Sequence, residues 1–359
     1  MEGLRHRIAE LGRSAGLDRV GFASPDPFPE VATEMARRRD SGESADLGFT
    51  YVNPAIATTP RQSFAWAATL VVGARAYLPE AGSPDNETGD GGTGRVARVA
   101  IGDRYRALRV SLQEIADALH GEGFRAEVLC DDNRLVDRAA AVRAGIGWWG
   151  KNTMVLIPGL GPWAVLGSVV TDAHLEPDPP LSRDCGSCSA CLPACPTGAL
   201  VAPGVLDARR CLAAWAQRPG LVPIEFRQAM GDRLYGCDDC LVACPPGGKL
   251  LRRSHQPAGR FDLGEVLHAS DETLIAWFGH WFLPDRNPGI IRRNALIAAG
   301  NSGAETLVDE VALYAAHPNW MLRTHAVWSL RRLGGSAATA VLRQRHGVES
   351  DSRVRAELD

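Results

Sequence analysis

The stretch CGSCSACLPACP (Cys185–Pro196) decides the fold of the middle of this chain. Three of its cysteines are spaced closely enough to wrap one iron–sulfur cube, and the fourth, which precedes a proline, is placed to reach a second cube. The stretch CDDCLVACP (Cys237–Pro245) forms a matching half, and Cys211 lies between the two. Thiolates in this order suit two adjacent 4Fe–4S clusters, which store and relay single electrons.

The spacing is that of a bacterial two-cluster ferredoxin, and it divides the cysteines into two sets. One cluster takes Cys185, Cys188, Cys191 and Cys244, and the other takes Cys195, Cys211, Cys237 and Cys240. Pairs of Cys-x2-Cys also suit tetrahedral zinc. The triple run followed by Cys-Pro, together with its second half, favours iron–sulfur. Cys130 is left over at the end of an apolar run, which is typical of a buried small hydrophobic residue.

The residues before the cysteine runs predict an α+β domain, because apolar and amphipathic stretches alternate there. We expect helices at 1–16, 104–120 and 135–144, and strands at 18–24, 69–78 and 124–130. Residues 153–157 and 163–170 flank a PGLG turn and predict a β-hairpin. The Gly-, Pro- and Asp-rich residues 79–94 predict a surface loop.

An internal repeat marks the C-terminal part of the chain. The strings RRNA, RTHA and RVRA begin at Arg292, Arg323 and Arg353, at steps of 31 and 30 residues. Stacked helix pairs of the HEAT kind have such a period, because each pair buries its apolar face against its neighbour. Chance similarity among Arg- and Ala-rich helices is the alternative. The predicted domains are therefore 1–175 (α+β), 176–250 (ferredoxin-like, two-cluster) and 251–359 (helical repeat).

The composition excludes some classes of protein. The 359 residues carry a formal net charge of −3, which argues against indiscriminate nucleic-acid binding. From Lys249 onward, 14 Lys and Arg stand against 12 Asp and Glu, which permits a local contact with nucleic acid. No stretch is apolar for the roughly 18 residues of a membrane span. The N-terminus predicts an amphipathic helix rather than a signal peptide. We therefore expect a cytoplasmic protein, in which clustered cysteines bind metal.

In four strings the chain resembles the epoxyqueuosine reductase family. The strings are AGIGWWGKN (Ala144–Asn152), VLDARRC (Val205–Cys211), MGDRLYGCDDC (Met230–Cys240) and RNALIAAGN (Arg293–Asn301). The order of the predicted domains also fits this family, including its C-terminal HEAT-like module. The first and third strings are far more specific than a ferredoxin motif.

The resemblance implies a redox enzyme of tRNA modification. Its N-terminal α/β domain is expected to hold cobalamin in a base-off form against the ferredoxin-like insert. The nearer cluster then reduces cobalt to the nucleophilic cob(I) state. The implied substrate is epoxyqueuosine at the wobble position, in the anticodon loop of a tRNA, and the product is queuosine. A low-potential donor such as flavodoxin or ferredoxin supplies the electrons, and the family suggests a monomer with no membrane association.

The resemblance also assigns roles to individual residues. It implies that Asp131 is the general acid that protonates the departing oxygen. It implies cofactor contacts at Arg98, Lys151, Asn152, Gln228, Met230 and Tyr235. Candidates for tRNA phosphate contacts are the repeat residues Arg292, Arg293, Arg323 and Arg331. The structural alternatives are an N-capping turn at Asp131, a plain surface lysine at Lys151, and solvated or helix-capping arginines in the repeat.

Two departures from the family pattern concern the substrate. Arg104-Tyr105-Arg106 stands where the family has Asp-Tyr-His, and Arg134 and Asp137 stand where it has Pro and Glu. One alternative is therefore a related cobalamin and iron–sulfur reductase that acts on another substrate, such as an organohalide. A second alternative is a ferredoxin-like electron carrier without enzymatic activity, which would not bind cobalamin.

Overall fold

The computed structural model describes residues 2–78, 92–254 and 259–359, which form two compact units. The first unit contains the described residues of 2–78, 103–209 and 239–254. The second contains those of 92–102, 210–238 and 259–359. The chain thus contributes more than one segment to each unit. The functional division at residues 175 and 250 stays a prediction.

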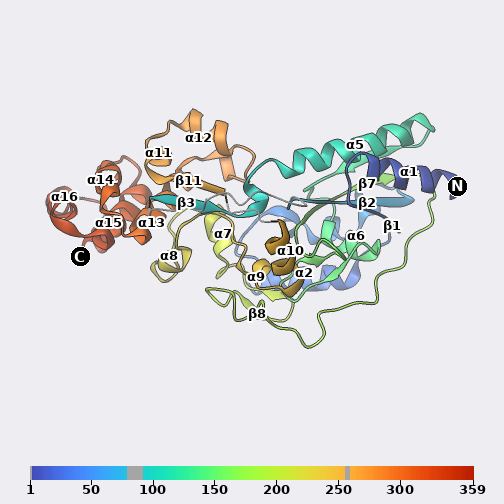
Figure 1. The fold of residues 1–359 in the computed structure, drawn as a ribbon, viewed down its shortest axis with the longest axis horizontal. Helices are drawn as coiled ribbons and strands as arrows, with labels where there is room; N and C mark the ends of the chain where they lie inside the picture. The colour runs from blue at the N-terminus through green and yellow to red at the C-terminus, as the bar shows by residue number, and fades with distance from the viewer. Residues whose placement is uncertain (1, 79–91, 255–258) are drawn as a thin grey trace. The chain divides into compact units, whose positions relative to one another are not determined.

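A four-stranded antiparallel sheet forms the centre of the first unit, in the order β1-β2-β7-β4. These strands are β1 (Arg19–Ala23), β2 (Thr69–Ala76), β4 (Ala126–Leu129) and β7 (Ala164–Thr171). Helices α1 (Glu2–Ser14) and α5 (Arg104–Gly121) cover one face, and α6 (Asp137–Arg143) covers the other (Figure 1). Because both faces are covered, β2 is apolar on its two sides. The predicted helices and strands of this region are confirmed.

The remaining elements of the first unit are short. They are α2 (Pro29–Asp40), η1 (Phe49–Tyr51), α3 (Pro54–Ala57), α4 (Pro60–Ser63), β5 (Trp148–Trp149), β6 (Val155–Leu156), β8 (Leu200–Ala202), β9 (Val205–Leu206), α9 (Asp239–Val242) and α10 (Pro245–Ser254). The cysteine run from Cys185 to Cys195 contains none of these elements, so its conformation depends on turns and on the groups that it surrounds.

The predicted hairpin at 153–157 and 163–170 is wrong. Strand β6 pairs with β5, and β7 pairs with β2 and β4. Only an isolated bridge between Ile157 and Gly161 spans the PGLG turn. A central position between β2 and β4 pairs β7 along its whole length with β2 and over its last four residues with β4, and it buries both faces of β7. A local hairpin offers neither.

The second unit combines a small sheet with helices. Its strands are β3 (Thr93–Val96), β10 (Arg233–Tyr235) and β11 (Gly259–Asp262), in the order β10-β3-β11. The predicted loop at 79–94 lies outside the described residues, except that its last residues begin β3. The helices are η2 (Arg98–Ala100), α7 (Leu212–Gln217), α8 (Ile224–Met230), α11 (Leu263–His268), α12 (Asp271–Phe278), η3 (Pro284–Arg286), α13 (Gly289–Ser302), η4 (Glu305–Leu307), α14 (Val308–Ala315), α15 (Trp320–Leu333), α16 (Gly335–Val348) and α17 (Ser352–Leu358).

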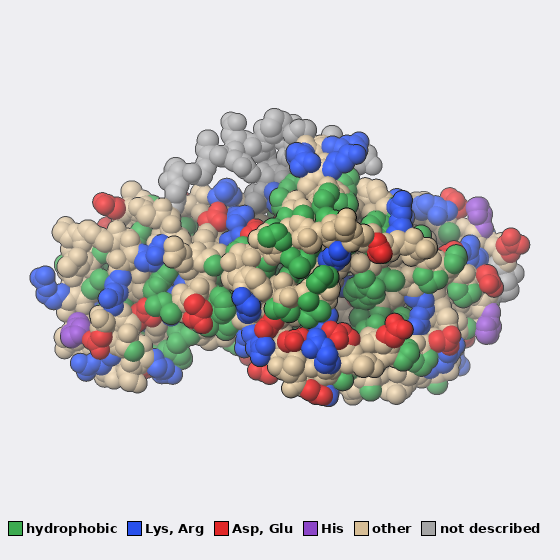
Figure 2. Space-filling model, turned by 90° about the horizontal axis from the view of Figure 1, so that it is seen from below, with side chains coloured by type: hydrophobic (Ala, Val, Ile, Leu, Met, Phe, Trp, Pro, Cys, Tyr) green, Lys and Arg blue, Asp and Glu red, His purple; other side chains and the backbone are tan. Residues whose placement is uncertain are grey.

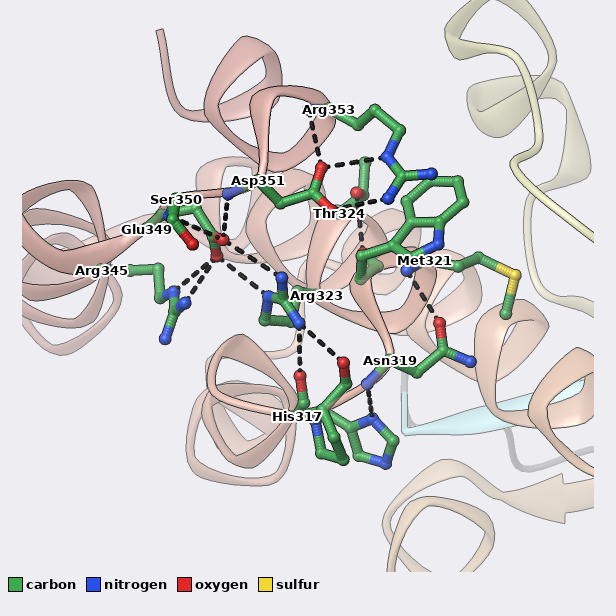
Figure 3. A network of polar contacts seen from close by, with 12 residues as sticks. His317, Asn319, Met321, Arg323, Thr324, Arg345, Glu349, Ser350, Asp351 and Arg353 are labelled. Carbon is green, nitrogen blue, oxygen red and sulfur yellow. Dashed lines mark hydrogen bonds and ion pairs between the residues drawn. The ribbon is translucent and has the colours of Figure 1, made fainter.

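The three copies of the repeated string lie on α13, α15 and α17, and α15 packs against both α13 and α17 as successive layers of the repeat. A buried ionic network joins two of these layers (Figure 3). The Glu349 carboxylate is fully buried and accepts hydrogen bonds from Arg323 (2.9 Å) and Arg345 (2.8 Å), and from the backbone N–H of Asp351 (2.9 Å). These donors lower the pKa of Glu349 to about 2, although burial opposes the shift.

We expect Glu349→Gln to loosen the repeat by about 2–4 kcal/mol, because two half-buried guanidinium groups lose a fully buried counter-charge. The contribution of the carboxylate is complete above its ordinary pKa and is lost as the pH falls through its lowered pKa. Amide hydrogen exchange in α15 and α17 at neutral pH measures the effect. Glu305→Gln, at an exposed position of the same unit, is the control. Equal exchange in the two variants would contradict this role for Glu349.

Among the residues that the structure describes, none of the helices has the length and apolar character needed to span a bilayer.

Candidate iron–sulfur and proton-donor sites

Four cysteines of the first unit line one cavity. They are Cys185, Cys188 and Cys191, from the loop before β8, and Cys244, from the start of α10. Cys191 and Cys244 are buried, whereas Cys188 is exposed, so one side of the cavity reaches solvent. This set is the first of the two that the spacing predicts. Four thiols around one cavity fit the donor set of a 4Fe–4S cube.

The thiols of this cavity are close enough to influence one another. Burial raises the pKa of Cys191, and the neighbouring Cys185, Cys188 and Cys244 raise it further. Burial also raises the pKa of Cys244, again with contributions from Cys185 and Cys188. A protein interior that disfavours bare thiolates suits iron ligation, because the metal takes up their charge when they deprotonate.

The predicted pair Lys151 and Asn152 forms another part of the cavity wall. The Lys151 ammonium group donates to the carbonyl of Gly186 (2.7 Å), which follows the first cysteine of the loop. Asn152 is buried, and its side-chain amide donates to the carbonyl of Cys240 (3.4 Å). The turn after β5 therefore holds both cysteine runs. The sequence predicts a cobalamin contact for this pair, and the structure places both residues at the cavity of the four cysteines.

The four cysteines of the second predicted set are divided between the two units. Cys195 and Cys240 belong to the first unit, and Cys211 and Cys237 belong to the second. Within the first unit, the Cys195 sulfur accepts a hydrogen bond from the backbone N–H of Ala199 (3.1 Å). The assignment of these four residues to one cluster stays a prediction.

Asp131 lies in the turn between β4 and α6 with a φ of 55°. This left-handed conformation is costly for most residues and is concentrated at functional sites. The side chain of Asp131 reaches solvent, but partial burial still raises its pKa. The nearby Arg109 and Arg138 oppose this shift. A carboxyl group that keeps its proton to a higher pH suits a proton donor.

Two further titratable side chains, Asp137 and Tyr105, lie near Asp131. Neither was predicted as a functional residue. Burial raises the pKa of Asp137 well above its ordinary value, and the charge of Asp131 adds to this effect. Its Oδ1 atom has no hydrogen-bond partner among the described residues. Burial also raises the pKa of the Tyr105 hydroxyl. In the sequence, Tyr105 lies within a departure from the family pattern and Asp137 is another departure. Neither signal predicts a role in proton transfer, because Asp137 has the pattern of an ordinary acidic residue in a first helical turn.

The turn that carries Asp131 is anchored by arginines. Arg134, one of the departures from the family pattern, forms ion pairs with Asp132 (2.7 Å) and Glu127 (2.8 Å). Arg138 donates to the carbonyl of Thr153 (3.4 Å), which follows the turn of Lys151 and Asn152. The turn of Asp131 and the wall of the four-cysteine cavity are thus connected through α6.

The other predicted cofactor contacts lie in the second unit. Met230 is fully buried in an apolar cluster. Tyr235 stacks on Trp281 with 4.5 Å between ring centroids, and its hydroxyl donates to the carbonyl of Phe282 (3.2 Å). This packing counts against cofactor contacts by Met230 and Tyr235. Gln228 is exposed on α8.

Arg98, the remaining predicted cofactor contact, is paired with Asp238, the residue after Cys237. The two side chains form an ion pair (3.2 Å), and the backbone N–H of Arg98 donates to the same carboxylate (2.9 Å). Both side chains are largely buried, with 13% and 10% of their surface exposed. The pair holds the start of the second cysteine run in place.

The four predicted tRNA contacts differ in exposure. Arg331 is exposed and donates to the carbonyl of Glu357 (2.7 Å). Arg292 pairs with Asp271, and Arg323 pairs with Glu349. Arg293 is fully buried, and its guanidinium donates to backbone carbonyls. Its burial counts against a phosphate contact, so the interface proposed below leaves Arg293 out.

Two parts of the chain match families of known domains. Residues 184–247 match the 4Fe-4S double cluster binding domain, and residues 280–358 match HEAT repeats. The first match contains every cysteine of the two predicted sets and decides against zinc. The chain binds two 4Fe–4S clusters and ends in a HEAT-like repeat, as predicted.

Whole-chain relatives share one name. The epoxyqueuosine reductase of Bacillus subtilis is 32% identical over 366 residues, covering 99% of this chain and 94% of that protein. The enzyme of Pseudomonas aeruginosa is 32% identical over 352 residues, covering 92% and 95%.

Solved structures agree with the sequence comparison. A crystal structure of epoxyqueuosine reductase with an epoxyqueuosine-modified tRNA-Tyr stem loop has a TM-score of 0.89 at 31% identity and covers 99% of this chain and 97% of that chain. The structure from Streptococcus thermophilus has a TM-score of 0.86 at 26% identity, with 98% and 96% covered. The sequence identity and the shared architecture, over nearly the whole length, place this chain in the epoxyqueuosine reductase family.

Proposed function

We propose that the protein reduces epoxyqueuosine to queuosine in tRNA. The observation that supports this most strongly is the combination of a four-thiol cavity with full-length similarity to named epoxyqueuosine reductases. Loss of the epoxide oxygen as water requires two electrons and two protons. The two clusters deliver the electrons one at a time, and an acidic side chain must protonate the oxygen that leaves.

Asp131 is the proposed proton donor. Its raised pKa and its strained backbone support this role. In a related structure from Bacillus subtilis, the loop that carries a catalytic aspartate is swung out of the active site. Arg134 and Arg138, which anchor the turn of Asp131, are in a position to hold the corresponding loop of this chain in place.

Family membership also supports cobalamin as a cofactor. When bound, it would supply a reduced cobalt centre able to open the epoxide. Of the predicted contacts, Gln228 presents an exposed amide, and Lys151, Asn152 and Arg98 have polar side chains whose donors are engaged by nearby backbone or carboxylate groups. We keep these four as proposed contacts and leave out Met230 and Tyr235.

The activity is tested with anaerobically purified protein reconstituted with iron, sulfide and cobalamin. A low-potential donor such as flavodoxin or ferredoxin is supplied together with tRNA that carries epoxyqueuosine. Formation of queuosine in that tRNA supports the proposal. A protein that binds cobalamin and about eight irons but forms no queuosine contradicts the proposed substrate. The position to study next would then be Arg104–Arg106, where the chain departs from its family.

We propose that the protein acts in the cytoplasm, where its tRNA substrate would be found, and that it acts there as a monomer. Basic and acidic side chains are interspersed over the face that Figure 2 shows. Such a surface binds RNA through local arginine contacts rather than through one extended basic field. Arg331 and Arg292 of the repeat are the proposed phosphate contacts, and Arg323 is a further proposed contact that also holds Glu349.

We expect the double variant Arg292→Glu and Arg331→Glu to bind tRNA at least about 10-fold more weakly at 0.1 M salt. Each lost phosphate contact also lowers the slope of log affinity against log salt by about 0.7–0.9. Filter binding over a range of salt concentrations measures both quantities. Arg343→Glu, an exposed residue of α16, provides the same kind of charge change as a control. Unchanged affinity and slope in the double variant would remove this part of the repeat from the interface.

A further inference from the structure

One side of helix α13 holds two neighbouring segments by their backbones. It consists of Arg293, Asn294 and Asn301, which we call the α13 clamp. All three donate side-chain hydrogen bonds to main-chain carbonyls, in α7 and the turn after it, and in α8 and β10. These elements lie beside α13 (Figure 1). They connect, within the second unit, to Cys211 at one end and Cys237 at the other.

Arg293 closes the C-terminal end of α7. Its guanidinium donates to the carbonyls of Trp215 (2.7 Å), Arg218 (2.5 Å) and Gly220 (2.9 Å). The last carbonyls of a helix lack partners within the helix and carry a partial negative charge. Burial lowers the pKa of Arg293 to about 9, so its position is costly for a charged group. The benefit is a fixed end for the helix whose N-cap residue is Cys211.

Asn294 joins α7 to β10. Its side-chain amide donates to the carbonyl of Ala216 (2.9 Å) and to that of Leu234 (2.7 Å). Its oxygen accepts from the Arg293 guanidinium (2.8 Å), which fixes the orientation of the amide. A single buried side chain thereby sets the distance between the two segments that carry the cysteines.

Asn301 holds the other end of the second segment. Its amide donates to the carbonyls of Arg227 (2.8 Å) and Gly231 (3.0 Å), at the end of α8. The Arg227 guanidinium is itself buried and paired with Glu357 of α17 (2.8 Å). The last layer of the repeat therefore also supports the approach to Cys237.

The residue before Cys237 leaves little freedom for adjustment. Gly236 has a φ of 70°, and a Cβ atom there would lie 2.5 Å from the Cβ of Ala97. The backbone N–H of Ala97 donates to the carbonyl of Tyr235 (2.8 Å), which keeps β3 and β10 together. A displacement of β10 therefore passes on to Cys237.

We propose that the α13 clamp sets the separation of Cys211 and Cys237 and is thereby a positioning device for the second 4Fe–4S cluster. Metal–ligand distances tolerate deviations of only about 0.2 Å, so a shifted segment withdraws its thiolate from the cluster. The helical repeat then serves the electron path as well as the tRNA. The inference rests on the proposed assignment of both cysteines to that cluster and requires no particular substrate.

The test compares Asn294→Ala and Asn301→Ala with the unmodified protein after anaerobic reconstitution. Iron content is measured, and the reduced clusters are followed by electron paramagnetic resonance. We expect iron to fall from about eight to about four per chain in Asn294→Ala, and less far in Asn301→Ala, while the signal of the first cluster persists. Cys211→Ala provides the reference spectrum of a protein without the second cluster. If Cys211→Ala retains both clusters, the ligand assignment fails, independently of the clamp.

Glu349→Gln controls for a general loss of stability, because it weakens the same unit without touching the clamp. It should retain about eight irons. The proposal is overturned if folded Asn294→Ala retains both clusters, if it loses both equally, or if Glu349→Gln loses the second cluster to the same extent. Circular dichroism establishes folding. If Asn294→Ala does not fold, Asn301→Ala decides by the same criteria.

Discussion

Replacing Asp131 by Asn should lower the rate of queuosine formation by about 10²–10⁴-fold, the usual contribution of a general acid. The amide cannot supply the proton that the departing oxygen needs, and a free alkoxide is a poor leaving group. We expect both clusters to be retained, because Asp131 is not a predicted ligand of either and does not line the cavity of the first. Single-turnover assays of the reconstituted enzyme, with iron content measured in parallel, separate the two effects.

The pH dependence gives a sharper test of the same role. A proton donor acts in its protonated form, so the rate should fall as the pH rises through the raised pKa of Asp131. Arg109 lowers that pKa, and Arg109→Met should therefore move the alkaline limb to higher pH. Asp132→Asn is the matched control, since its carboxylate is held by Arg134. We expect it to lose less than about 10-fold, short of the loss of a general acid. If Asp131→Asn and Asp132→Asn lost activity to the same extent, the role of Asp131 would be structural and not that of a proton donor.

Replacing Cys244 by Ala should abolish queuosine formation and remove one cluster of the two. Cys244 is the last cysteine of the second run, but it lines one cavity with the first three cysteines of the first run. Its loss leaves three thiolates where the cube needs four. Alanine is preferred to serine because a serine oxygen can still bind iron. Iron should fall from about eight to about four per chain, and only one of the two paramagnetic signals should remain.

Cys130→Ala is the control for this variant. Cys130 is buried outside both cysteine runs and does not line the cavity of the four cysteines. Burial raises the pKa of its thiol to about 12, so the thiol stays protonated. It should retain both clusters. If the Cys244→Ala protein still bound about eight irons, the assignment of Cys244 to the first cluster would be wrong.

The sequence by itself determined the features that depend on local spacing. The cysteine runs predict the donor set around the first cavity, because three ligands of a cube must lie within one short loop. The repeat predicts the helices at Arg292, Arg323 and Arg353, because each must present the same apolar face to its neighbour. The spacing of apolar residues likewise predicts where the main helices and strands of the first unit lie in the sequence.

Tertiary structure decided which groups meet and which are shielded from water. It paired β7 with β2 and β4 rather than with its neighbour in sequence, because a central strand buries more surface. It placed Arg293 in the interior as a clamp, where sequence suggested a phosphate contact. It also buried the Oδ1 atom of Asp137 without a hydrogen-bond partner among the described residues. Burial and desolvation are sums over atoms distant in the chain, so no local pattern of residues reports them.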